Sequence, residues 1–129
     1  MDDPDFPEAL RAFIREHIPD VDAADILLQL ARAPGREYAV EALIDELKPT
    51  AVSDAVARKH LALFEERGLV AVGPEGSYRY SPASREVDEC VQALMRVYNA
   101  RPVTMVRTIY ALRDEKIRSF ADAFRLKKK

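Results

Sequence analysis

A group of hydrogen-bonding side chains in the middle of the chain has the chemistry to contact a nucleic acid. Arg58 and Lys59 carry the cations that most often donate to phosphate oxygens and to the guanine edge. Ser53 is a favourable helix N-cap, and the free N–H groups of a helix N-terminus also attract phosphate. Asp54 would repel phosphate unless it accepts from a cytosine amine. The candidate DNA-contacting residues of this group are Ser53, Asp54, Ala55, Arg58 and Lys59.

Tyr78 and Arg79 form a second candidate contact, because both side chains could reach backbone phosphates. They follow the glycine-containing turn 73–77, and a β-biased run, 69–72, precedes that turn, so the sequence predicts a hairpin. Alternation along 78–80 is equally typical of a strand with one core face and one solvent face. Both interpretations stay open.

His17, His60 and Cys90 could serve as metal ligands or nucleophiles, but each stands alone in the sequence. Neither histidine has a second ligand at useful spacing, so we expect both to be structural. A single cysteine excludes an intrachain disulfide, and we expect Cys90 in the apolar face of its helix, with a redox-sensing thiol as the alternative. Because no phosphate-binding glycine loop, nucleophile elbow or paired-carboxylate site occurs, we expect no enzymatic activity, cofactor or metal.

The candidate DNA-contacting residues need a helix that turns them outward, and the sequence predicts one over 53–67. Ser53 suits its N-cap, and Gly68 suits the left-handed residue that follows a helix. Apolar side chains recur at helical spacing on the opposite face. These inward positions are Ala57, His60, Leu61 and Phe64.

Two shorter helices are predicted before this one. Asp20 or Asp22 can cap a helix over 23–32, and a second apolar helical pattern covers 40–47. The intervening residues 37–39 are long enough only for a short extended piece. The resulting order is helix, extended piece, helix, tight turn, helix and hairpin.

Further helices are predicted on both sides of this core. Residues 6–18 show helical spacing, Ser84 can cap a helix that ends before Pro102, and 103–112 and 114–126 are predicted as two separate helices. The C-terminal helices carry more apolar surface than such a core needs. We expect them to bury it by self-association, or to offer a small-molecule effector pocket or a dock for another protein.

The segment from His60 to Val70, HLALFEERGLV, resembles the recognition-helix end and wing start of winged-helix bacterial regulators of the MarR and ArsR types. The resemblance covers 22–81 and implies a winged helix-turn-helix core, mostly α with a small β-hairpin wing, within a single domain 1–129. It also implies a homodimer, with the flanking helices 6–18 and 84–126 at the interface. An ArsR-type metal sensor would carry clustered thiolates, which this chain lacks.

Charge is distributed unevenly along the chain. Residues 1–50 carry twelve acidic and five basic side chains, whereas 101–129 carry three and nine. The basic C-terminal segment can bind nucleic acid or complement a helix dipole. The acidic N-terminus and the lack of a long apolar run predict a protein that is neither exported nor membrane-inserted, and the cysteine usage favours the cytoplasm. The prominent basic residues are Arg113, Lys116, Arg118, Arg125 and Lys127 to Lys129.

Two functions follow from these patterns. The first is a dimeric, cytoplasmic transcription regulator that binds double-stranded DNA, with the helix 53–67 in the major groove of each half-site. The alternative is a winged-helix protein-interaction module that does not bind DNA directly. The acidic first half of the chain, with Asp54 and Glu75 near the expected DNA face, favours the alternative.

Overall fold

Side-chain caps and prolines define where the helices begin. In the computed structural model, which describes residues 3–127 and side chains up to residue 124, Asp20 Oδ1 accepts from the Ala23 N–H at 2.9 Å and caps α2 (Val21–Ala31). Ser53 caps α4 (Asp54–Glu66) and Ser84 caps α5 (Arg85–Ala100) in the same way. The N-cap that the sequence left open between two aspartates is therefore Asp20. The remaining helices are α1 (Glu8–His17), α3 (Val40–Leu47) and α6 (Pro102–Lys127).

Gly68 carries the chain from α4 into the hairpin, as its position after the helix predicts. Its φ is +76°, in the left-handed region, and a Cβ there would lie 2.9 Å from the Cβ of Ala83. A side chain would therefore be both strained and crowded. The Leu69 N–H donates back to the Phe64 carbonyl at 2.9 Å, which closes the helix end.

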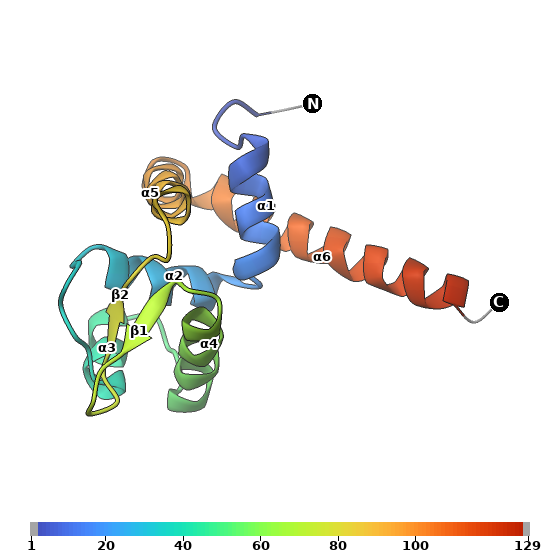
Figure 1. Ribbon diagram of the computed structural model, residues 1–129. Helices are drawn as coiled ribbons and strands as arrows, with labels where there is room; N and C mark the ends of the chain where they lie inside the picture. Colours follow the sequence, from blue (N-terminus) through green and yellow to red (C-terminus); the bar gives the residue numbers. More distant parts are fainter. Residues whose placement is uncertain (1–2, 128–129) are drawn as a thin grey trace.

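The hairpin consists of the antiparallel strands β1 (Val70–Val72) and β2 (Tyr78–Tyr80), with Val70 opposite Tyr80 and Val72 opposite Tyr78. Tyr38 joins its edge, because its backbone exchanges two hydrogen bonds of 2.8 Å with Tyr78. The short extended piece expected at 37–39 is confirmed. Figure 1 shows the hairpin beside α3 and α4 at one end of the molecule.

The core is centred on α2, which packs against α3, α4, α5 and β2. Its Ile26, Leu27 and Leu30 have no exposed surface. The inward face predicted for α4 is confirmed, because Ala57, His60, Leu61 and Phe64 are all buried. α1 lies over α5 and α6 on the other side of α2. A mostly helical chain with one small hairpin is thus what the sequence predicted.

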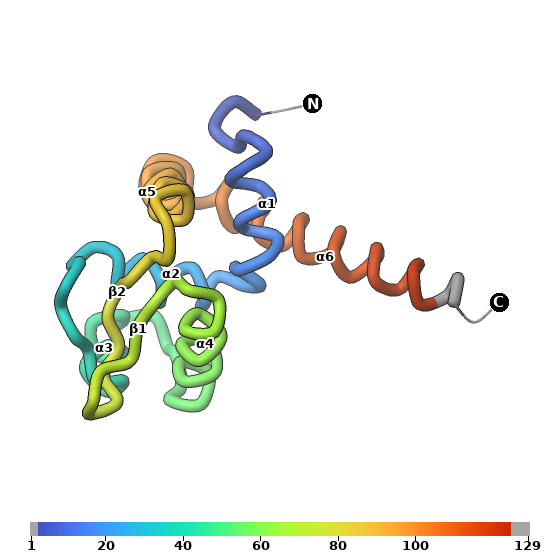
Figure 2. The backbone as a smooth tube through the Cα atoms, in the orientation of Figure 1, coloured from blue at the N-terminus to red at the C-terminus, as the bar shows by residue number. Residues whose placement is uncertain are grey.

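The C-terminal helix differs from the prediction. Residues 103–112 and 114–126 form one continuous helix, α6, because no glycine or proline follows Pro102 to break it. Met105, Ile109 and Leu112 anchor its first half in the core. Its second half extends away from the other helices (Figures 1 and 2). Arg125 and the three final lysines, part of the predicted basic tail, lie outside the residues whose side chains are described.

Three large apolar side chains on the extended half of α6 remain exposed: Ile117 by 54%, Phe120 by 75% and Phe124 by 55%. Neighbouring large apolar side chains that are exposed together are uncommon on a monomer and usually mark a contact surface. Within the described residues, no helix has the length and apolar character needed to cross a bilayer.

Candidate nucleic-acid interface

α4 exposes the face on which the candidate residues were predicted. Ser53, Asp54, Ala55, Arg58 and Lys59 are all exposed, whereas the opposite face of α4 is buried against α2 and α3. Figure 1 shows α4 at the edge of the molecule, at the end away from α5. The helix therefore has room to approach another molecule along this face.

Arg58 is already engaged by carboxylates. Its Nε lies 2.5 Å and 3.1 Å from the two carboxylate oxygens of Asp54, and its Nη2 lies 3.7 Å from Glu41 Oε2 of α3. The hydrogen bond that Arg58 donates to Asp54 is the main reason that the pKa of Arg58 is raised. The two carboxylates offset the charge of Arg58 locally. Arg58 can therefore bind another anion only if it breaks these ion pairs or shares its N–H donors between them and the new anion.

Lys59 differs from Arg58 because no carboxylate lies within ion-pair distance of it in the part of the chain with described side chains. Lys59 is exposed and follows Arg58 directly on α4. Lys59 is therefore the cation on this face whose charge is not offset by a direct ion pair.

The hairpin that carries Tyr78 lies beside α4 (Figure 1). Tyr78 and Arg79 are both half-buried, and successive strand residues point to opposite faces. Tyr80 is buried, and its hydroxyl donates to Asp88 Oδ1 of α5 at 2.6 Å. The alternation thus has a structural role at Tyr80, and Tyr78 and Arg79 retain partial access to solvent.

Two interactions at this end of the molecule were not foreseen. The Asp54–Arg58 pair has the spacing of residues one helical turn apart, which is a recognisable signal for an ion pair. Arg36 pairs with Glu46 at 2.5 Å and stacks 4.2 Å from the centre of the Tyr38 ring. No local sequence pattern indicates the interaction of Arg36, because Arg36 lies in the connection between α2 and α3 whereas Glu46 lies near the end of α3.

The histidines and Cys90 are held by the fold. His60 is 3% exposed and its Nε2 lies 3.3 Å from Asp20 Oδ1. His17 is half-buried, and burial together with the Arg67 cation lowers its pKa. Cys90 is only partly buried against the core, less than the sequence predicted, and burial raises its pKa. No cluster of three potential metal ligands occurs among the described residues.

Comparison with known proteins gives no relative: no family model, curated protein or solved structure matches the chain significantly. Its function is therefore inferred from the geometry of the chain itself.

Proposed function

We propose that this protein is a homodimeric, DNA-binding transcription regulator with a winged helix-turn-helix core. The observation that carries the proposal is the exposed face of α4, with Ser53 at its capped N-terminus and Lys59 nearly two turns later, beside the hairpin. In a helix-turn-helix, the second helix of the motif enters the major groove with its N-terminal residues against the bases. Here that helix is α4, and α3 is the helix before it.

Each element has a part in this proposal. The free N–H groups at the start of α4 receive a phosphate, and Lys59 binds a neighbouring phosphate. Arg58 donates to a guanine edge while Asp54 accepts from the cytosine paired with it or from a neighbouring one. Arg79 and Tyr78 approach the backbone from the hairpin, which serves as the wing.

The exposed face of α6 supplies the dimer contact. Val103, Tyr110, Ile117 and Phe124 recur every seven residues, which is the spacing of an apolar seam between packed helices. The exposed fractions of these four side chains run from 39% to 63%. A dimer doubles the number of phosphate contacts, which matters for a chain with a net charge of −2.

DNA binding can be tested by fluorescence anisotropy on duplex DNA from upstream of the protein's own gene, at low salt. Reversing both cations in Arg58→Glu/Lys59→Glu is expected to weaken binding by about a hundredfold, because two contacts become repulsions. Arg85→Glu/Arg96→Glu is the matched control, since it reverses two exposed cations of α5. Absence of binding by the unchanged protein, or equal affinity of the two variants, contradicts the proposal.

The second candidate is a protein-interaction module of the same architecture that does not bind DNA. The observation that favours it is the engagement of Arg58 by Asp54 and Glu41, within a segment, 22–81, that holds ten acidic and seven basic side chains. Such a surface attracts phosphate weakly. Recovery of a stoichiometric protein partner, together with no salt-dependent retention on DNA, decides for this candidate.

A further inference from the structure

A pocket of about 240 Å³ opens where the C-terminal ends of α1 and α4 meet the middle of α6. Its apolar lining includes Ile18, Leu63 and Ile117. Four cationic side chains, Arg15, Arg67, Arg113 and Lys116, also line it, against the single carboxylate of Glu16. This cavity is on a different part of the molecule from the exposed N-terminal face of α4.

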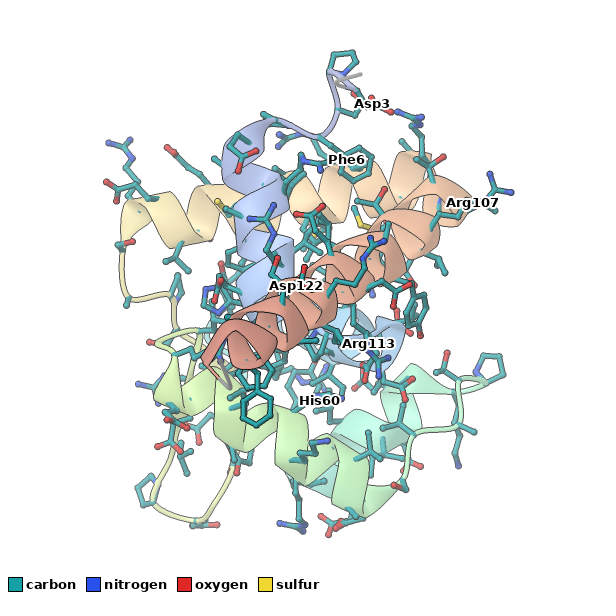
Figure 3. The ribbon with its side chains drawn as sticks, turned by 90° about the vertical axis from the view of Figure 1, so that its right-hand side faces the viewer. Asp3, Phe6, His60, Arg107, Arg113 and Asp122 are labelled. Atoms are coloured by element: carbon teal, nitrogen blue, oxygen red, sulfur yellow. The ribbon has the colours of Figure 1, made fainter. Side chains whose placement is uncertain are left out.

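The internal ion pairs leave part of this positive charge without a partner. Arg113 has no carboxylate within 4 Å among the described residues, and Figure 3 shows it on the side of α6 toward the lower half of the molecule. Arg67 donates to the backbone carbonyl of Glu16, which carries no net charge. Lys116 shares Glu16 at 3.7 Å. Among the described residues, the one carboxylate in the lining is therefore paired with Lys116 alone, and Arg67 and Arg113 have no carboxylate partner.

Arg15 adds an unused hydrogen-bond donor. Its Nη2 lies 3.4 Å from Glu115, but its Nε is buried without a hydrogen-bond partner among the described residues. A buried donor without an acceptor is costly, so such groups usually meet a partner when a site is filled. The pKa of the adjacent His17 is lowered first by burial and then by Arg67, while Glu16 opposes and Lys116 adds to this lowering.

The size and lining of the pocket limit what can occupy it. Pockets for drug-sized ligands are about 300–1,000 Å³, so this one suits a compact body of roughly one ring. Its apolar lining favours a hydrocarbon body, and its surplus cations favour a carboxylate. The chain's own C-terminal segment is a poor occupant, because it carries the same sign of charge as the pocket.

We propose that this pocket binds a small amphipathic carboxylate, with the acid group among Arg67, Arg113 and Lys116 and the hydrocarbon body against Ile18, Leu63 and Ile117. The pocket is lined by a single chain and does not require DNA, while its Ile117 is also a residue of the dimer seam proposed above. Arginine and lysine hydrogen bonds to the ligand's carboxylate hold its orientation, and the apolar contacts select its shape.

The test uses cyclohexanecarboxylate as the probe, titrated into the full chain and followed by backbone amide chemical shifts. Cyclohexanecarboxamide keeps the shape without the charge, and acetate keeps the charge without the ring. Saturable shifts are expected around Ile18, Leu63, Arg67 and Ile117, with each comparison compound binding at least about tenfold more weakly. No saturation by about 10 mM probe, or equal binding of the acid and the amide, overturns the proposal.

Charge-removing variants locate the site. Arg113→Gln/Lys116→Gln is expected to weaken probe binding by at least about tenfold, since it removes two of the cations that hold the acid group. Arg118→Gln is the matched control, because it removes an exposed cation of α6 that does not line the pocket. These exposed positions keep the fold intact, which the amide spectrum reports directly. Probe affinity that is equal in the double variant and the control overturns the proposal.

Discussion

Arg58 Nε lies 2.5 Å from Asp54 Oδ1 on the exposed face of α4, one helical turn away. The pair places the residue best suited to read a base in contact with the residue least suited to approach phosphate. The two side chains therefore have opposite effects on DNA affinity. Removing Asp54 is expected to raise the affinity, and removing Arg58 is expected to lower it.

Replacing Asp54 with asparagine is expected to strengthen nonspecific duplex binding by roughly three- to tenfold at low salt, because it removes a negative charge and releases Arg58. The free energy of unfolding should fall by about 0.3–1 kcal/mol, since Asp54 complements the dipole at the start of α4. Anisotropy with a mixed-sequence duplex measures the first effect and urea unfolding the second. Glu86→Gln, in the first turn of α5, is the control for the dipole effect. Unchanged or weaker DNA binding by the Asp54 variant would count against a role for α4 in DNA contact.

Phe120 is 75% exposed on the extended half of α6, so a charged side chain there should not disturb the monomer fold. Phe120 lies about one helical turn from the seam residue Ile117, and Phe120→Glu combined with Ile117→Glu is expected to convert a dimer of twice 14.6 kDa into a monomer of 14.6 kDa. Buried charges across an apolar seam cost several kcal/mol, which is the reason for the effect. Sedimentation equilibrium at micromolar concentration measures the mass. Ser119→Glu, which adds a charge at an exposed polar position of the same helix, should remain dimeric. A monomeric unchanged protein would sink the dimer proposal.

Asp20 has two tasks that can be separated by mutation. Its Oδ1 caps α2 through the Ala23 N–H and also lies 3.3 Å from the buried His60 Nε2. Asp20→Ala should lower the free energy of unfolding by roughly 2–4 kcal/mol, combining a lost cap with a buried imidazole left without a partner. Ser84→Ala removes a cap alone and should cost about 1 kcal/mol. Asp20→Asn retains the acceptor oxygen and should restore most of the difference. Equal losses in the two alanine variants would show that the His60 contact adds nothing.

Tyr98 ties α5 to α2 through a 3.0 Å hydrogen bond from its hydroxyl to Asp25 Oδ1. Burial, followed by this carboxylate, raises the pKa of Tyr98 to about 12. The stabilisation from the neutral phenol is therefore complete below the ordinary tyrosine pKa of 10.0 and is lost as the pH rises toward 12.

Tyr98→Phe should lower the free energy of unfolding by about 1–2 kcal/mol at neutral pH and make its alkaline decline shallower. Urea unfolding at neutral and alkaline pH measures both effects. Some alkaline decline should remain, because the pKa of Tyr80 is also raised, first by burial and then by Asp88. Tyr78→Phe is the matched control, since Tyr78 is half-buried and its hydroxyl makes no hydrogen bond among the described residues. Identical behaviour of the two variants would exclude a stabilising role for the Tyr98–Asp25 bond.

Several features of this protein were determined by the sequence alone because they depend on residues within one or two helical turns. The caps at Ser53 and Ser84, the buried face of α4, the left-handed Gly68 and the hairpin all follow from such neighbours. The outward position of Arg58 and Lys59 was determined in the same way. The separate helices predicted on either side of Arg113 were wrong, because no breaker residue interrupts α6.

Tertiary structure decided what those outward residues can do. Glu41 reaches Arg58 from another helix, and Asp25 meets Tyr98 across a separation of 73 positions. The pocket between α1, α4 and α6 likewise combines cations that are distant in the chain. Such contacts depend on how amphipathic helices pack against one another, and periodicity specifies which face is buried without specifying its partner. The sequence therefore determined which side chains face outward, and the packing decided which charges meet there.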